Sequence, residues 1–245
     1  MKENPYNRPE FYEKYAQMPR SKYGCVAAGE WTTLKSALPS LEGAAVLDLG
    51  CGYGWHCRYA AQQGAEYVIG VDISQKMLER ARQLTNDDNI KYECLAMEDV
   101  EFLPNTFDVV LSSLALHYVE DYAGVVNKTA GFLKPGGFFV FSAEHPIYTA
   151  SGNQDWIYDE KGNIQYFAVD RYFEEGLRNT QFLGEHIVKY HRTITTYLEV
   201  LLANGFELCH ILEPKPPQEM MDADPSMANE LRRPMMFIVS ARKKS

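Results

Sequence analysis

Three glycines at alternating positions, Gly50, Gly52 and Gly54, follow a short apolar run that contains Asp48. A glycine loop lets the backbone approach a ligand closely because glycine has no Cβ and adopts conformations that other residues avoid. A second apolar run ends at an acidic residue, Asp72, 22 residues after Gly50. Glycines at such a junction, with a carboxylate at the end of the next run, indicate a ligand-binding site.

The segments around these residues alternate between strand-like and helix-like patterns. Short apolar runs predict buried strands, and apolar residues at helical spacing predict helices between them. Gly64 is expected to close the first helix, Ser74 to cap the second and Pro135 to stop the third. The predicted strands lie within 43–50, 66–74, 90–97, 107–113 and 138–145, and the predicted helices within 55–65, 74–85 and 122–137.

Repeated strand–helix–strand units predict a doubly wound parallel α/β sheet. In such sheets ligands bind outside the carboxyl ends of the strands, so polar residues that follow different strands are expected in one crevice. The residues expected there are Gly50, Asp72, Met97, Ser113 and His145.

Composition narrows the class of partner. A chain of 245 residues with 46% hydrophobic and 23% charged residues is typical of one globular domain with additions. The formal net charge of -9 disfavours nucleic acid as a partner. No apolar run approaches the roughly 20 residues that span a bilayer, and the five cysteines form no CxxC pair. We therefore expect a cytoplasmic protein with a small-molecule substrate, no membrane, no nucleic acid and no metal.

The glycine spacing distinguishes two classes of nucleotide-like ligand. A dinucleotide fingerprint reads G-x-G-x-x-G, whereas Gly50 to Gly54 read G-x-G-x-G. This loop resembles motif I of the class I S-adenosylmethionine-dependent methyltransferases. Segments 96–102, 107–121, 133–146 and 195–242 resemble the later motifs of that family in the same order.

The resemblance implies a Rossmann-like, doubly wound, seven-stranded sheet, mostly parallel with an antiparallel last strand, in three layers. It divides the chain into N-terminal lid helices (1–40), a cofactor-binding core (41–145), an aromatic-rich substrate-covering insertion (146–192) and a C-terminal helix and strand hairpin (193–245). Asp72 would accept hydrogen bonds from the ribose hydroxyls, Met97 and Glu98 would lie beside adenine, and Arg20 could reach the methionine carboxylate. The residues expected at S-adenosylmethionine are Arg20, Asp48, Gly50, Gly52, Gly54, Asp72, Ile73, Met77, Met97, Glu98 and Ser113.

Two histidines are candidates for the chemistry at the acceptor. His117 and His145 follow the fourth and fifth predicted strands, and either could remove a proton from a hydroxyl or amine. Each could instead be a structural loop histidine. The segment 146–192 holds nine aromatic residues, which could cover the acceptor or form a small separate core.

Three functions remain open from the sequence. The favoured one is a methyltransferase that acts on a small molecule, as a monomer or homodimer. A non-catalytic S-adenosylmethionine-binding protein would keep the same loop, and an NAD-dependent oxidoreductase is disfavoured by the glycine spacing. The acceptor itself is not predicted.

Overall fold

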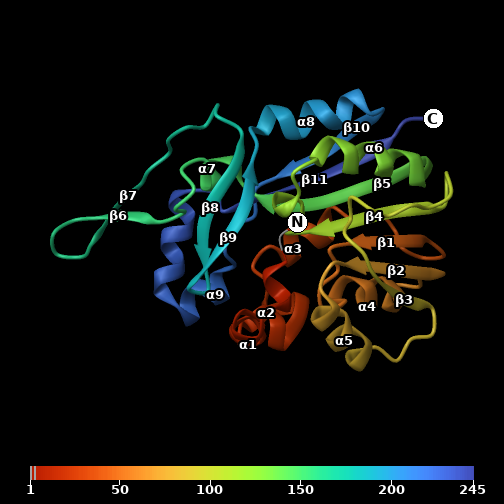
Figure 1. Cartoon of the computed structure of the whole chain (residues 1–245), viewed down its shortest axis with the longest axis horizontal. Coiled ribbons are helices and arrows are strands. Elements are labelled where there is room, and N and C mark those ends of the chain that lie inside the picture. The colour runs from red at the N-terminus through yellow and green to blue at the C-terminus, as the bar shows by residue number, and fades with distance from the viewer. Residues whose placement is uncertain (1, 3) are drawn as a thin grey trace.

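Seven strands form one twisted sheet in the computed structural model, which describes residue 2 and residues 4–245 (Figure 1). The strand order is β10-β11-β5-β4-β1-β2-β3. The pairs β1–β2, β2–β3, β1–β4 and β4–β5 are parallel, and β11 is antiparallel to both β5 and β10. The strands are β1 (Ala45–Leu49), β2 (Tyr67–Asp72), β3 (Ile90–Cys94), β4 (Phe107–Ser113), β5 (Leu133–Glu144), β10 (Phe206–Leu212) and β11 (Met236–Lys243). This arrangement confirms the predicted seven-stranded sheet with one antiparallel last strand.

Helices cover both faces of the sheet and make three layers (Figure 1). Successive strand residues point to opposite faces, so neighbouring residues of β1 enter different cores. Val46 packs with residues of α4 and α5, whereas Leu47 packs with residues of α6 and α8. These helices are α4 (Trp55–Gln62), α5 (Gln75–Leu84), α6 (Tyr122–Phe132) and α8 (Ile194–Ala203), and α3 (Trp31–Ser36) packs through Leu34 beside β4, β5 and β11.

Two helix boundaries show how local chemistry sets the ends of elements. Ser74 caps α5 as predicted, because its side chain accepts a hydrogen bond from the backbone N–H of Met77. Helix α6 ends at Phe132, three residues before the Pro135 that was expected to stop it, and β5 begins at Leu133. A residue before proline avoids helical geometry, so the chain is already extended when it reaches Pro135.

The N-terminal residues form short helices at the carboxyl end of the sheet. They are η1 (Pro5–Asn7), α1 (Pro9–Ala16), α2 (Pro19–Tyr23) and η2 (Gly24–Ala27). Asn4 donates to the carbonyl of Ile73, and Asn7 accepts hydrogen bonds from the Ser74 hydroxyl and the Lys76 backbone. The expected lid range of 1–40 includes residues 1 and 3, which lie outside the described residues.

The segment between β5 and α8 forms a short helix and two hairpins. Helix α7 (Pro146–Thr149) precedes the hairpin of β6 (Trp156–Tyr158) and β7 (Ile164–Phe167), which projects away from the body of the protein (Figure 1). The second hairpin, β8 (Gly176–Phe182) with β9 (Glu185–His191), packs against the η3 turn (Leu116–Tyr118) that follows β4. Its Phe182 ring also contacts Phe11 of α1. After β10 the chain forms α9 (Gln218–Ala223) and η4 (Pro225–Arg232) before it enters β11.

Candidate active site

A cavity of about 810 Å³ opens at the carboxyl ends of β1, β2, β4 and β5. Its size is within the range of cofactor and drug-sized ligand pockets. The wall contains residues from the glycine loop, the ends of β2 and β4, the N-terminal segment and the β8–β9 hairpin. Residues far apart in the sequence therefore surround one cavity, as the topology predicts.

The glycine loop forms one wall of this cavity. Gly50 and Gly52 line it with φ values of 77° and 54°, which are unfavourable for residues that carry a Cβ. A side chain on Gly50 would overlap the Cβ of Ala115. The Gly50 N–H donates to the Val71 carbonyl at 2.8 Å, so the loop is folded back onto β2 and leaves a cradle for a ligand.

Two residues predicted at the cofactor lie behind the loop and are not part of the cavity wall. Gly54 begins α4, and a Cβ there would overlap the hydroxyl of Tyr92. Asp48 is 1% exposed, accepts a hydrogen bond from the Cys57 thiol, and has a pKa that burial raises to about 7. The sequence motif correctly located the loop, but these two residues support it from inside the protein.

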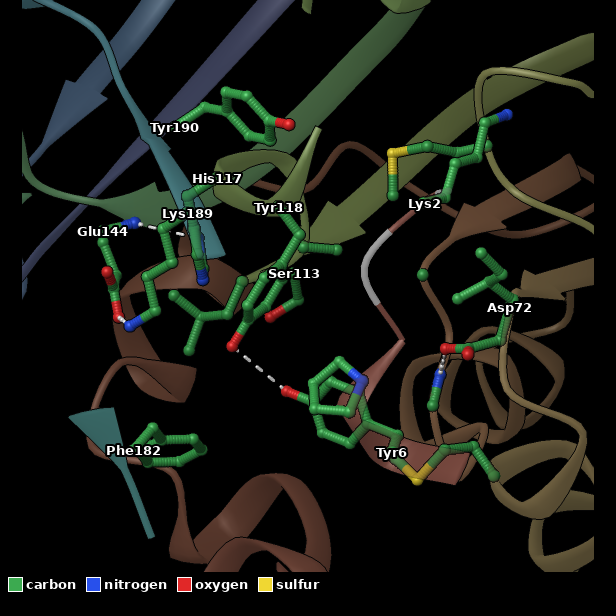
Figure 2. Close-up of a pocket in the computed structure, with 18 of the residues that line it drawn as sticks. Lys2, Tyr6, Asp72, Ser113, His117, Tyr118, Glu144, Phe182, Lys189 and Tyr190 are labelled. Atoms are coloured by element: carbon green, nitrogen blue, oxygen red, sulfur yellow. Dashed lines mark hydrogen bonds and ion pairs between the residues drawn. The ribbon is translucent and has the colours of Figure 1, made fainter. Parts of the chain in front are cut away.

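Asp72 points into the cavity at the end of β2 (Figure 2). Its carboxylate accepts the Gly52 N–H at 2.9 Å and the Ser74 N–H at 2.8 Å. Burial raises the pKa of Asp72 to about 6, although both hydrogen bonds favour the charged form. Each carboxylate oxygen keeps a further lone pair, so a ligand with neighbouring hydroxyl groups can bind there.

Most of the other predicted cofactor residues also line the cavity. Arg20 is among them, but its guanidinium forms hydrogen bonds of 2.5 and 2.7 Å with the two carboxylate oxygens of Glu30. The remaining predicted residues on the wall are Ile73, Met77, Met97, Glu98 and Ser113.

At the opposite end of the cavity, a buried ion pair lies beside His117 (Figure 2). Lys189 of β9 and Glu144 of β5 are 2.6 Å apart, and Gln154 hydrogen-bonds to both of them. Burial opposes ionisation of Glu144, but Lys189 and Gln154 favour its charged form more strongly, so the pKa of Glu144 is lowered. We call Glu144, Lys189 and Gln154 the buried triad.

His117 is 2% exposed and lies on the η3 turn. Its Nδ1 accepts a hydrogen bond from the backbone N–H of Glu144 at 3.4 Å. The pKa of His117 is lowered to about 4, chiefly by burial and to a smaller extent by Lys189 and Arg192, against the opposing effect of Glu144. The ring is therefore neutral at neutral pH.

His145, the second histidine predicted at the acceptor, is not brought to the cavity wall by the structure. Its ring is not on the cavity wall, because Nδ1 accepts the backbone N–H of Ile147 at 3.0 Å and so caps α7. Its Nε2 faces a carboxylate oxygen of Glu213 at 3.1 Å. Both ring nitrogens are therefore used in holding the end of β5.

Two tyrosines lie between the Asp72 end and the buried triad. The hydroxyls of Tyr6 and Tyr118 are 3.3 Å apart, and both side chains line the cavity (Figure 2). The sequence reasoning missed Tyr6, Tyr118 and the buried triad. One feature of the sequence could have indicated that Lys189 is buried, because it is a cation between apolar residues of a predicted strand. No residue near it in the sequence indicates that it pairs with Glu144.

Comparison with known proteins identifies the class of enzyme. A family model described as a methyltransferase domain matches residues 47–141. A solved S-adenosylmethionine-dependent methyltransferase from Mesorhizobium loti is 44% identical, with a TM-score of 0.84 over 90% of this chain and 100% of that chain. The chain belongs to the class I S-adenosylmethionine-dependent methyltransferases.

Partial relatives of this methyltransferase differ in what they act on. A ubiquinone biosynthesis O-methyltransferase from Neisseria meningitidis is 37% identical over 129 residues, which cover 47% of this chain and 54% of the relative. A tRNA U34 carboxymethyltransferase from Hahella chejuensis is 29% identical over 161 residues, which cover 64% of this chain and 45% of the relative. Family membership therefore leaves the acceptor open.

The cavity of the methyltransferase suits its cofactor. A Cβ at Gly50 would overlap Ala115 and one at Gly52 would press on Met77, so the loop keeps its shape only with glycine, and the Asp72 carboxylate has lone pairs for two hydroxyl groups. Within the described residues no group of three or more His, Cys, Asp or Glu side chains is placed to hold a metal ion. No helix in that part of the chain has the length and apolar character to cross a bilayer.

Proposed function

We propose that this methyltransferase transfers the methyl group of S-adenosylmethionine to a small-molecule acceptor bound between His117 and the buried triad. The observation that carries the proposal is the continuity of one cavity from Asp72 and the glycine loop to His117, Glu144 and Lys189. About 810 Å³ accommodates a cofactor and a small second molecule.

The Asp72 end is the proposed cofactor site. Gly50 and Gly52 present their backbone to the amino-acid part of the cofactor, and Asp72 accepts hydrogen bonds from the ribose hydroxyls. Ile73, Met77, Met97 and Glu98 surround the adenine, and Ser113 faces the middle of the cavity. Arg20, held by Glu30, turns its remaining guanidinium N–H groups toward the carboxylate. S-adenosylmethionine supplies an activated methyl group on a sulfonium sulfur.

The opposite end is the proposed acceptor site. Tyr6, Tyr118, Tyr148, Phe182 and Tyr190 give it an aromatic lining, which favours a flat acceptor. The N-terminal segment and the β8–β9 hairpin shield it from water, so much of the rate can come from holding the acceptor at attack distance in a dry site. The insertion is thus proposed to act at the acceptor end, and the lid at both ends of the cavity, since Asn4 and Asn7 bind the chain beside Asp72.

The test supplies radiolabelled S-adenosylmethionine with three classes of acceptor: a small-molecule fraction of cell extract, bulk tRNA and denatured protein. Label should move to the small-molecule fraction, and Asp72→Ala should abolish that transfer at low cofactor concentration. Transfer only to tRNA or protein would overturn the small-molecule assignment.

Binding of the cofactor is measured separately by calorimetry. S-adenosylmethionine and S-adenosylhomocysteine should bind, and NAD should bind much more weakly because the loop lacks the dinucleotide spacing. Fractionation and size measurements test the remaining predictions, a cytoplasmic location and a monomer or homodimer.

A further inference from the structure

The nitrogen atoms of His117 have different surroundings. Nδ1 faces the backbone N–H of Glu144 and accepts a hydrogen bond from it. Nε2 has no hydrogen-bond partner among the described residues, and His117 lines the cavity. Nε2 is therefore the nitrogen left for a molecule bound at the acceptor end.

A neutral imidazole carries one proton, and the backbone decides where it lies. If Nδ1 accepts the Glu144 N–H, the proton must be on Nε2, which then donates and has no lone pair for a base. The opposite tautomer would place two N–H groups against each other. Burial chiefly keeps the ring from taking a second proton, Lys189 of β9 and the nearby Arg192 add to this effect, and Glu144 of β5 opposes it.

Four other titratable groups on the cavity wall, Glu144, Tyr6, Tyr148 and Lys189, do not replace His117 as a base. Glu144 uses one carboxylate oxygen for Lys189 and the other for Gln154. Tyr6 and Tyr148 are held in the protonated form, since burial raises the pKa of both phenols. Lys189 is paired with Glu144 and directs two of its N–H groups to Glu144 and Gln154.

We propose that His117 donates a hydrogen bond to the acceptor through Nε2, and that the acceptor atom to be methylated is already ionised at neutral pH, as in a carboxylate or an acidic phenol. The proposal rests on the proposed function and deepens it by naming the class of acceptor. It replaces the expectation that His117 removes a proton.

The reaction balances without a base. A lone pair of the acceptor oxygen forms the bond to the methyl carbon, and the methyl–sulfur bond breaks with its electron pair remaining on sulfur. The cation and the anion become a neutral thioether and a neutral methyl ester or ether. No proton is released, whereas an alcohol or an alkylammonium acceptor would release one per turnover.

The first experiment reads the tautomer directly by ¹⁵N NMR of the protein saturated with S-adenosylhomocysteine, with His117→Ala used for assignment. We expect the Nε2–H tautomer from pH 6 to 8. Added benzoate should shift the Nε2 resonance, and benzyl alcohol at the same concentration should not. An Nδ1–H tautomer, or an Nε2 resonance unmoved by benzoate, would overturn the proposal.

The second experiment counts protons with an indicator dye in weak buffer, using the acceptor found by the label-transfer assay. We expect no proton release per methyl transferred, and one proton per turnover would contradict the proposal. Failure to find any small-molecule acceptor would count against the proposed function alone, because the NMR result decides the role of His117 independently.

Variants of His117 separate a donor from a base. His117→Ala should lower kcat/KM about 10- to 100-fold, mainly through KM, as expected for one lost hydrogen bond to a charged group. His117→Gln places an amide N–H near the Nε2 position and should recover much of that loss, whereas the shorter His117→Asn should not. If His117 were a base, all three variants would lose the same fraction of kcat/KM. The rate of the unmodified enzyme would also fall at low pH.

Discussion

The two ends of the cavity hold their carboxylates in opposite ways. Among the described residues, Asp72 receives hydrogen bonds only from backbone N–H groups, and burial raises its pKa to about 6. Glu144 is paired with Lys189 and Gln154, and its pKa is lowered. The Asp72 carboxylate is thus left for hydroxyl groups of a ligand, whereas the Glu144 carboxylate is already satisfied by the protein. The comparison indicates that a buried carboxylate is available to a ligand when the neighbouring protein groups leave its charged form incompletely stabilised.

The largest effect that would test this comparison is expected at the buried triad. Lys189→Met should lower the free energy of unfolding by about 3–5 kcal/mol, because it leaves Glu144 as an uncompensated buried charge. Urea denaturation measures the loss, and Lys161→Met on the exposed β6–β7 turn is the control. Adding Glu144→Gln should restore most of the stability; no recovery would show that Lys189 acts through packing.

At the other end of the cavity, removal of the Asp72 carboxylate should weaken cofactor binding and leave the fold unchanged. Asp72→Ala should weaken S-adenosylmethionine binding by about 1.5–3 kcal/mol, the range for a hydrogen bond to a charged group. Calorimetry measures the affinity, with Asp88→Asn on the exposed loop before β3 as the control. Unchanged affinity together with a lower melting temperature would make Asp72 only a cap for α5.

The raised pKa of Asp72 predicts how stability changes with pH. The pKa of Asp72 is about 6 in the folded protein and ordinarily 3.8, so its stabilising contribution is complete at low pH and is lost as pH rises through 6. Asp48, with a pKa of about 7, acts in the same direction at slightly higher pH. The lowered pKa of Glu144 changes the stability of the protein only below about pH 4.5.

The unliganded protein should therefore be less stable at pH 8 than at pH 5, and Asp72→Asn should remove roughly 1.4 kcal/mol of that decline. Urea midpoints of both proteins at the two pH values measure this. An equal decline in wild type and variant would mean that the Asp72 carboxylate is not destabilised by burial.

The smallest effect is expected between the two ends. A double-mutant cycle of Tyr6→Phe and Tyr118→Phe should give a coupling of about 0.5–1.5 kcal/mol in the free energy of unfolding, the usual net value of one hydrogen bond. Tyr166→Phe, an exposed tyrosine of β7, is the control. Zero coupling would show that the contact between the two hydroxyls does not stabilise the fold.

The sequence predicted the Asp72 end well because that end is local. Gly50, Gly52 and Asp72 belong to one strand–helix–strand unit, and apolar runs and glycine positions mark where each strand stops. Asp48 in β1 and Gly54 before α4 flank the loop as the motif indicates, but a motif cannot tell which of its residues face the cavity. That distinction depends on Tyr92 and Cys57, which pack behind the loop.

The acceptor end could not be predicted in the same way. Glu144 and Lys189 are 45 residues apart, and their contact requires the β8–β9 hairpin to fold back onto the end of β5. His145 shows the converse error, since it follows the correct strand yet turns toward Glu213. The role of His117 depends on one backbone N–H, which no residue type in the sequence reveals.

The contacts of residues 4–7 set an order on the assembly of the chain during synthesis. These residues leave the ribosome early, yet Asn4 binds Ile73, Asn7 binds Ser74, and Tyr6 meets Tyr118. None of these partners exists until at least 67 further residues have been added. The glycine loop and β2 can therefore be complete before the segment that covers them docks. The Asp72 end is therefore formed open and is covered only after β2 is complete, so the nascent chain passes through a stage in which a ligand can enter there without displacing the N-terminal segment.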